Sequence, residues 1–445
     1  MSLARYKEYY SAIIRLGLPI LIGQVGMIVV GFADNIMVGQ YSTEALASAS
    51  FVNNVFNVAI LACIGFSYGL TPLIGALFAQ KRDNTIGATL RNGLFINTIF
   101  SLVATGIMTI LYFNLHRMGQ PEELLPLIRP YYILYLIGLL PISIFNVFAQ
   151  WAYAINRTKM PMWIILAANA VNISGNYLLI YGKCGFPELG LTGAGISTLL
   201  SRIFSVASIM TVFFCLKHYR SYRDGFNRSS LTSLHLRQIN RTSWPVSLQM
   251  ALETGAFSFA AVMAGWLGKI PLASFQVMVI VGTLGFCVYY SIAASVSVLV
   301  SNAAGLGDNA GIRRVSFAGY HILLVLATVS STVFIFFGQH LIKAFSDDPA
   351  VVMTSMTLIV PLVLYQYGDA TQINFANALR GTSNVMPMLW IAFVSYVIVG
   401  LPSTYLLAFP LGLGLYGIFL SFSVSLFLAA ALFFHFFMRT TRTQR

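Results

Sequence analysis

The chain has 445 residues, of which 58% are hydrophobic and only 9% are charged. Soluble globular domains carry about 25% charged residues, so this composition excludes an ordinary soluble protein and indicates an integral membrane protein. A formal net charge of +13 would also suit a nucleic-acid-binding protein, but the basic residues occupy alternate loops, which argues against that class.

Twelve apolar stretches recur along the chain, each long enough for the ~20 residues that cross a bilayer as a helix. They lack the period-two alternation of a barrel strand, and Gly and Pro are spread through them. We therefore expect an all-α integral membrane protein with twelve transmembrane helices. The expected helices cover residues 13–39, 46–79, 88–112, 129–154, 161–181, 190–216, 244–266, 272–304, 315–337, 351–379, 385–407 and 413–437.

The basic residues predict the orientation of these helices. One set of alternate loops and termini holds 20 of the 26 Lys and Arg, from Arg5 to Arg445, and six of these lie in residues 217–241. The opposite set of loops holds five, and Arg202 alone lies deep within a span, since every other Lys and Arg lies in a loop or near the end of a span. The positive-inside rule therefore places both termini and the segment 217–243 in the cytoplasm.

The sequence also repeats itself at a separation of 226 residues, so that Pro19 matches Pro245 and Met160–Met162 matches Met386–Met388. Six spans lie on each side of the basic segment, and six crossings return the chain to the same side of the membrane. We therefore expect two six-helix bundles related by a parallel internal repeat around a central cleft, as in many secondary transporters. An old duplication that is kept only for packing is the alternative.

The repeat predicts three regions of the chain. Residues 1–216 form an N-lobe with helices 1 to 6, and residues 244–445 form a C-lobe with helices 7 to 12. Residues 217–243 form a basic cytoplasmic linker.

Only three of the thirteen carboxylates fall inside the spans: Asp34, Glu253 and Asp369. A charge at the bilayer centre costs roughly 2.5–3.5 kcal/mol on insertion scales, so we expect these acids to have a use. None has an acidic counterpart in the other half of the repeat, which favours function over symmetric packing. The candidate uses are an ion or proton path, a substrate contact and a buried ion pair.

Each acid has polar neighbours at helical spacing. Carboxylate, amide and hydroxyl oxygens are the ligands that a small hard cation prefers, and removal from water favours the neutral form of a carboxyl group, which suits proton exchange. Hydrogen bonds that hold helices together are the alternative role for the amides and hydroxyls. The residues are Asn169, Asn172 and Asn176 in the fifth span, Thr198 in the sixth, Gln249 in the seventh, and Tyr365 and Gln372 in the tenth.

Two further residues have open roles. Arg202 could neutralise Asp34 or another acid, bind an anionic group, or extend to the cytoplasmic interface. Pro19 lies fifteen residues before Asp34 on the first helix. Because proline interrupts the helical hydrogen bonds, Pro19 is a candidate hinge, with a static kink as the alternative.

Three runs, GFADNIMVGQYSTEALASAS, GLTGAGIST and SLQMALETGAF, together with the paired six-helix halves, resemble the multidrug and toxic compound extrusion (MATE) transporters. The resemblance covers essentially the whole chain, and the pair Glu253 and Asp369 is more similar to the NorM-like branch than to the DinF-like branch. It implies a secondary active multidrug efflux transporter that exchanges organic cations for Na⁺ or H⁺ by alternating access.

The resemblance also implies the sites. Asp34, Asn172, Asn176 and Thr198 match a cation- or proton-binding site in the N-lobe. Glu253, Asp369 and Tyr365 match a cation- or substrate-binding site in the C-lobe. Asn176 departs from family members that carry Asp at this position, and the change lowers the negative charge of the N-lobe site.

The expected partners are small organic cations, aromatic and hydrophobic in character, and the lipid bilayer of a bacterial inner membrane. We expect a monomer with no cofactor, no nucleic-acid partner and no metal other than Na⁺. A flippase for a lipid-linked substrate is the alternative, but three acids against one Arg within the spans favour cations. An enzyme is not expected, because the spans contain no HExxH or GxSxG motif and the chain has no Walker A sequence.

Overall fold

The computed structural model describes residues 6–118 and 121–442, and throughout these residues every regular element is helical. Arg5 and Arg445, two of the predicted cytoplasmic basic residues, lie outside the described ranges. The elements are α1 (Lys7–Tyr41), α2 (Thr43–Ser67), α3 (Leu70–Ala79), α4 (Asp83–Phe113), α5 (Leu125–Ala154), α6 (Lys159–Ile180), α7 (Gly190–Cys215), α8 (Arg220–Arg228), α9 (Ser233–Trp266), α10 (Lys269–Gly305), α11 (Asn309–Lys343), α12 (Pro349–Thr357), α13 (Ile359–Gly381), α14 (Met386–Ala392), the π-helix η6 (Phe393–Gly400), α15 (Leu401–Ala408) and α16 (Gly414–Thr440), with short 3₁₀ turns in some connections.

Eleven helices of the described chain are long and apolar enough to cross a membrane, and the number is twelve if α12 and α13 count as one span. These two helices are bent by 50° where they meet. Pro361 lies one turn beyond the break. Its ring would clash with the carbonyl group of the preceding turn in a regular helix, and it has no N–H to donate. The twelve predicted spans and the all-α class are confirmed, and the protein is a multi-pass membrane protein.

The chain divides into two compact units whose borders lie within helices. The N-terminal unit is Ile22–Ser247, and the C-terminal unit joins the chain up to Leu21 with the chain from Leu248 onward. Leu21 and Ser247 are 247 − 21 = 226 residues apart, which is the period of the sequence repeat. Each border falls two residues after a matched proline, Pro19 or Pro245.

These units group the chain differently from the predicted lobes at two places. The first half of α1 packs with the C-terminal unit, and the segment 217–243 packs with the N-terminal unit. A sequence repeat identifies which residues correspond, but not which end of a long helix packs in which bundle. Pro19 lies inside a helix that is assigned without a break from Lys7 to Tyr41, so its role as a hinge stays a prediction.

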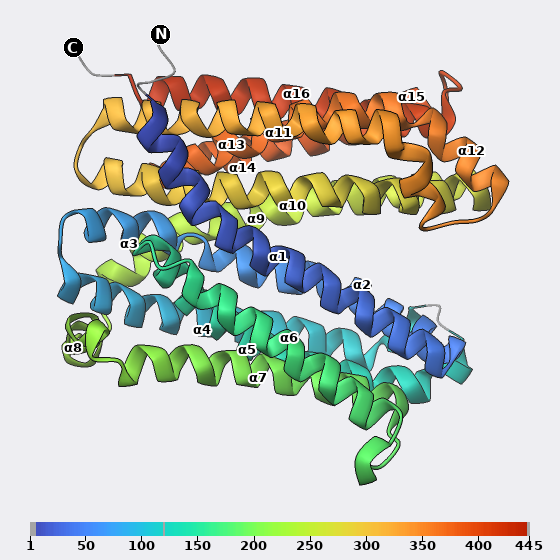
Figure 1. The fold of residues 1–445 in the computed structure, drawn as a ribbon, viewed down its shortest axis with the longest axis horizontal. Helices are drawn as coiled ribbons and strands as arrows, with labels where there is room; N and C mark the ends of the chain where they lie inside the picture. Colours follow the sequence, from blue (N-terminus) through green and yellow to red (C-terminus); the bar gives the residue numbers. More distant parts are fainter. Residues whose placement is uncertain (1–5, 119–120, 443–445) are drawn as a thin grey trace. The chain divides into compact units, whose positions relative to one another are not determined.

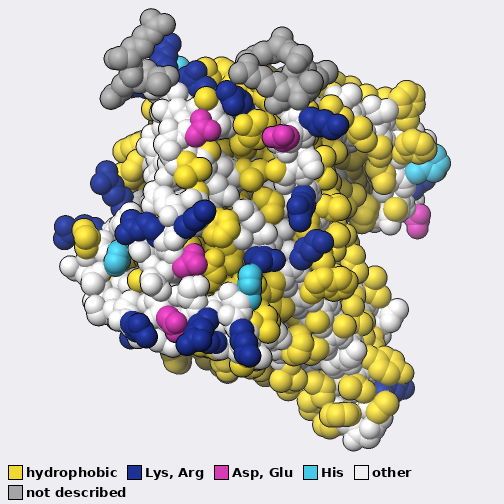
Figure 2. All heavy atoms as spheres, turned by 60° about the vertical axis from the view of Figure 1, so that its left-hand side comes forward, with side chains coloured by type: hydrophobic (Ala, Val, Ile, Leu, Met, Phe, Trp, Pro, Cys, Tyr) yellow, Lys and Arg dark blue, Asp and Glu magenta, His cyan; other side chains and the backbone are white. Residues whose placement is uncertain are grey.

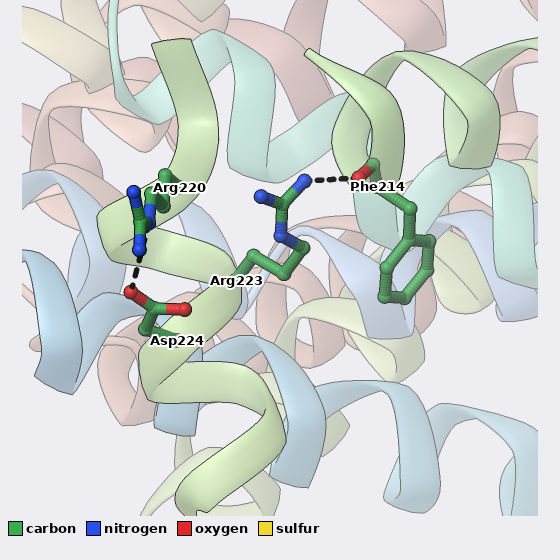
Figure 3. Close-up of polar contacts among 4 residues, drawn as sticks. All are labelled: Phe214, Arg220, Arg223 and Asp224. Atoms are coloured by element: carbon green, nitrogen blue, oxygen red, sulfur yellow. Dashed lines mark hydrogen bonds and ion pairs between the residues drawn. The ribbon is translucent and has the colours of Figure 1, made fainter. Parts of the chain in front are cut away.

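The segment after α7 is part of the N-terminal core. The indole ring of Trp151 lies 5.0 Å from the Tyr219 ring and 5.9 Å from the Tyr222 ring, both at edge-to-face angles. Burial raises the pKa of Tyr222 to about 12, so its hydroxyl stays neutral at physiological pH. Arg223 donates a hydrogen bond to the Phe214 carbonyl at the end of α7 (Figure 3).

The outer face of α8 is polar. Arg220 and Asp224 form an exposed ion pair of 3.8 Å on it (Figure 3). Figure 2 views the helix ends that include α8, where Lys and Arg side chains outnumber acidic ones and hydrophobic side chains cover the flank. This distribution is typical of a membrane protein whose helix ends meet water on a basic side.

A pair of glycines lets α8 pack so closely on α4 that the backbones of the two helices are in contact. A methyl group added at Gly225 would lie 2.1 Å from the Asn84 carbonyl oxygen, and one added at Gly87 would lie 2.0 Å from the Tyr222 carbonyl oxygen. Because the atoms in the way belong to the backbone, no side chain can move aside to make room.

We expect Gly225→Ala to destabilise the protein by about 1–3 kcal/mol through overpacking. Thermal unfolding of the purified protein in detergent measures the change. Gly106→Ala is the matched control, because Gly106 lies in α4 with no atom within 4 Å of the added methyl group. An unchanged melting temperature for Gly225→Ala would contradict the close packing of α8 on α4.

In the C-terminal unit, α13 runs alongside α10, α11 and α16 (Figure 1). Every residue of α13 from Gln372 to Gly381 is buried. Gly282 and Gly285 of α10 leave room for this helix, since a methyl group at either would lie within 2.6 Å of the Tyr365 hydroxyl or the Gln366 amide. A central helix with this many buried polar residues is unusual and places them together inside the bundle.

Candidate functional site

In the N-terminal unit, the four predicted residues form one chain of hydrogen bonds. Asn176 Nδ2 donates to Asp34 Oδ1 at 2.5 Å and also lies 3.3 Å from Asn172 Oδ1. Asn172 Nδ2 donates to Thr198 Oγ1 at 3.2 Å. The chain joins α1, α6 and α7, and the step of four residues between the asparagines puts both on the same face of α6.

This chain leaves an acceptor free. Asn176 is fully buried at 0% exposure, and its Oδ1 has no hydrogen-bond partner in the described structure. A buried acceptor without a donor is costly, and such an atom in a native structure calls for an explanation. With Asp34 beside it, the site offers a carboxylate and an amide oxygen, which suits a small cation or a proton on the carboxyl group.

Arg202 lies near this chain but does not form an ion pair with Asp34. Its guanidinium carbon is 4.7 Å from the centre of the Tyr135 ring, a cation–π contact. Gly138 gives it space, because a methyl group there would lie 2.3 Å from a guanidinium nitrogen. In the described structure no basic group lies within 4 Å of Asp34, and the two charges interact only over a longer distance.

Sequence reasoning missed the two tyrosines of this region. Tyr131 donates a hydrogen bond of 3.3 Å to the hydroxyl oxygen of Tyr135, and both side chains are buried. They interact electrostatically with both Arg202 and Asp34. Their spacing of four residues in the fourth span was visible in the sequence and would have placed both tyrosines on one face of that helix.

In the C-terminal unit, α9 and α13 bring the other two acids within electrostatic range of each other. Gln249 Nε2 donates to Glu253 Oε2 at 2.8 Å, as their four-residue spacing on α9 predicts. Asp369 is only 5% exposed, and its carboxyl group has no hydrogen bond or ion pair within the described ranges. The Tyr365 hydroxyl interacts electrostatically with Asp369. The three predicted C-lobe residues therefore lie in one polar region.

This region contains buried polar groups that the sequence analysis did not select. The side-chain amide of Gln366 and the hydroxyls of Tyr289 and Tyr396 are buried and without a hydrogen-bond partner of standard geometry among the described residues. Tyr289 interacts electrostatically with Asp369, and Tyr396 interacts with both acids. Their tyrosine and glutamine identities alone do not distinguish them from the other polar residues of the spans.

Comparison with known proteins identifies the family. A sequence model of the MatE family matches the chain twice, over residues 19–178 and 245–406. The two matches begin 245 − 19 = 226 residues apart, at Pro19 and Pro245, so they reproduce the internal repeat.

Curated relatives match along nearly the whole chain. One from Photorhabdus laumondii, named a probable multidrug resistance protein NorM, is 27% identical over 94% of this chain and 92% of its own length. Another of the same name, from Bradyrhizobium diazoefficiens, is 29% identical over 94% of this chain and 91% of its own length.

Solved structures have the same fold. A transporter of the MOP superfamily from Pyrococcus furiosus superposes with a TM-score of 0.88, at 19% identity, over 97% of this chain and 96% of that one. A eukaryotic MATE transporter superposes with a TM-score of 0.87, at 17% identity, over 98% and 99%. The two family-model matches together cover more than half of the chain and show that it belongs to the MATE family.

Proposed function

We propose that the protein is a secondary active multidrug efflux transporter that exchanges organic cations for Na⁺ or H⁺ by alternating access. One observation carries the proposal. Three carboxyl groups, those of Asp34, Glu253 and Asp369, lie in the interior of membrane spans, and no Lys or Arg of the described residues comes within 4 Å of any of them. The relatives that are named probable multidrug resistance proteins supply the substrate class.

The physical argument rests on the cost of an unpaired charge in the membrane. A carboxylate there favours a cation or a proton as its partner, because either one removes the uncompensated charge. If an organic cation and a small cation compete for the same negative charge, the release of one favours the binding of the other. Exchange then follows, provided that each ligand favours a different state of the transporter.

We assign the two polar regions complementary tasks. Asp34, Asn172, Asn176 and Thr198 bind the cation or proton in the N-terminal unit, and Glu253, Asp369 and Tyr365 bind cation or substrate in the C-terminal unit. Three acids lie in the interior of the predicted spans against one basic residue, Arg202. This excess of negative charge favours cationic substrates over the phosphate groups of a lipid-linked one.

Reconstitution into liposomes tests this function. A fluorescent organic cation is followed while a Na⁺ gradient and a pH gradient are imposed separately. We expect at least one gradient to drive efflux against the concentration of the dye, and the comparison identifies the coupling ion. If neither gradient drives movement of the dye in the wild-type protein, cation-coupled export is wrong.

Orientation in a bacterial inner membrane, with both termini in the cytoplasm, is a further part of the proposal. The chain offers a matched pair of positions for testing it, since Cys184 and position 228 are both exposed. The charge bias puts Cys184 outside the cell and position 228 inside.

In intact cells, an impermeant maleimide is therefore expected to label the native Cys184. It is not expected to label Arg228→Cys placed in a background that carries Cys184→Ser and Cys215→Ser. Permeabilised cells provide the control, because both positions should then react. Labelling of position 228 from outside intact cells would reverse the orientation.

A further inference from the structure

The two halves of the repeat build their polar regions from corresponding spans. In the N-terminal unit, the chain of hydrogen bonds joins α1, α6 and α7, which are the first, fifth and sixth spans. The repeat relates these to α9, to the eleventh span (α14, η6 and α15), and to α16. Asp34 on the first span thus corresponds to Glu253 on the seventh in the span that carries it, although the two positions do not align in the repeat.

A small cavity in the C-terminal unit lies among these three corresponding spans. Ala256 and Phe257 follow Glu253 by three and four residues, so this wall of the cavity lies one turn along the same face of α9. Its lining includes Ala256 and Phe257 of α9, Tyr396, Gly400 and Thr404 of the eleventh span, and Ser425 of α16.

Tyr396 is the residue of this lining whose buried hydroxyl lies close to the acids. Its side chain is 2% exposed, and its hydroxyl has no hydrogen-bond partner of standard geometry in the described structure. It interacts electrostatically with Glu253 and with Asp369. Asn176 has the same property in the other half, since its Oδ1 is also buried and unpaired beside an acid.

The local backbone explains how Tyr396 reaches this position. Residues Phe393–Gly400 form a π-helix, a rare conformation that is frequent at functional sites. Pro402 lies two residues after its end, and a proline lacks the N–H that would bond to the carbonyl of residue 398. Because its hydrogen bonds join residues five apart instead of four, the π-helix changes the direction in which Tyr396 points relative to a regular helix.

We propose that Tyr396 is a further ligand of the small cation or proton bound at Glu253 and Asp369, contributing its hydroxyl oxygen from the π-helical turn. The inference rests on the proposed function and adds a residue to its C-terminal site. A Na⁺ ion accepts the hydroxyl oxygen as a hard ligand, and a protonated acid donates a hydrogen bond to the same oxygen. The hydroxyls of Tyr289 and Tyr365 interact with Asp369 in the same region, so Tyr396 is the one of the three that also interacts with Glu253.

The test measures release of a bound dye from the purified full-length protein. Ethidium binding is followed by fluorescence while Na⁺ is added at constant pH, and separately while the pH is lowered without Na⁺. The two arms distinguish Na⁺ from H⁺ as the ligand. In wild type, the coupling ion releases the dye with a definite midpoint.

Tyr396→Phe removes only the hydroxyl group, so we expect the midpoint of release to move about tenfold toward a higher concentration of the coupling ion. Tyr405→Phe is the matched control, because Tyr405 lies in the same span and is exposed. It should leave the midpoint unchanged. A hydroxyl with a purely structural role would change the melting temperature without moving the midpoint.

An unmoved midpoint in Tyr396→Phe, with wild type responding normally, would overturn the assignment of Tyr396 and leave the proposed function intact. If wild type itself released no dye in either arm, the proposed function would fail at its first step. The first failure is therefore seen in the Tyr396→Phe variant and the second in the wild-type protein.

Discussion

The double variant Glu253→Gln with Asp369→Asn is expected to lose gradient-driven efflux while the protein stays folded and inserted. Each substitution keeps the size of the side chain and removes one negative charge. The two carboxyl groups lie in one region and interact with each other, so a cation there is shared between them. Removal of both leaves no acid in the spans of the C-terminal unit.

Each single variant should reduce efflux by roughly tenfold or more, since an interaction with a charged group contributes about 1.5–3 kcal/mol. The two effects should not add, because interacting acids take up protons as a pair rather than as independent sites. Efflux of a dye cation from proteoliposomes, normalised to the amount of inserted protein, measures both expectations.

Asp347→Asn is the control for these variants. It makes the same change of charge at an exposed position outside the spans, between α11 and α12, and efflux should not change. Normal efflux from the double variant at wild-type abundance would remove the C-terminal site from the mechanism.

The structure places the four predicted N-terminal residues together, and part of this has a physical reason that is visible in the sequence. Asn172 and Asn176 are four residues apart, so any helix through them presents both on one face. A polar face on an apolar helix must find polar partners inside the protein. The resemblance to MATE transporters implied that Asp34 and Thr198 are these partners. The structure brings all four together in one chain of hydrogen bonds.

Tyr396 could not be found in the same way. Its position depends on a π-helix, and a hydrophobic pattern read at 3.6 residues per turn assumes a regular helix. Pro402 was visible in the sequence, but a proline in a span is compatible with a kink, a break or a wide turn. The sequence therefore shows that the eleventh span is irregular without showing which residue the irregularity exposes to the acids.

The borders of the compact units could not be predicted from the sequence either. Hydropathy identifies α1 and α9 as single spans, and both are continuous helices in the structure. Whether one half of a helix packs with one bundle or another depends on side chains that are distant in the sequence. The repeat nevertheless predicts that the two borders are equivalent, and Leu21 and Ser247 satisfy its period of 226 residues.

Asp34→Asn is expected to separate substrate binding from transport. The asparagine oxygen can still accept the hydrogen bond that Asn176 donates to Asp34, so the chain through Asn172 to Thr198 can persist. The negative charge is lost, and Asp34 is the only acid within the spans of its half. The variant therefore resembles the protonated form and should hold the transporter in one state.

The expected result is an organic cation that still binds but is exported slowly. Coupling between two ligands is typically worth 1–3 kcal/mol, so loss of the coupling group should lower turnover by about 5- to 150-fold. Thr198→Val provides the comparison, because it removes the last hydroxyl of the chain without changing any charge. We expect its effect to be near that of one neutral hydrogen bond, about 0.5–1.5 kcal/mol.

Two measurements on the same preparations decide the role of Asp34: equilibrium binding of a dye cation, and its efflux under the gradient that drives the wild-type protein. Binding retained with slow efflux assigns Asp34 to coupling, because a ligand can shift the states of a transporter only through its differential affinity for them. Equal losses in Asp34→Asn and Thr198→Val would instead mean that the hydrogen bonds matter and the charge does not. Intact efflux in Asp34→Asn would make Asp34 structural and leave Glu253 and Asp369 as the only acids available for coupling within the spans.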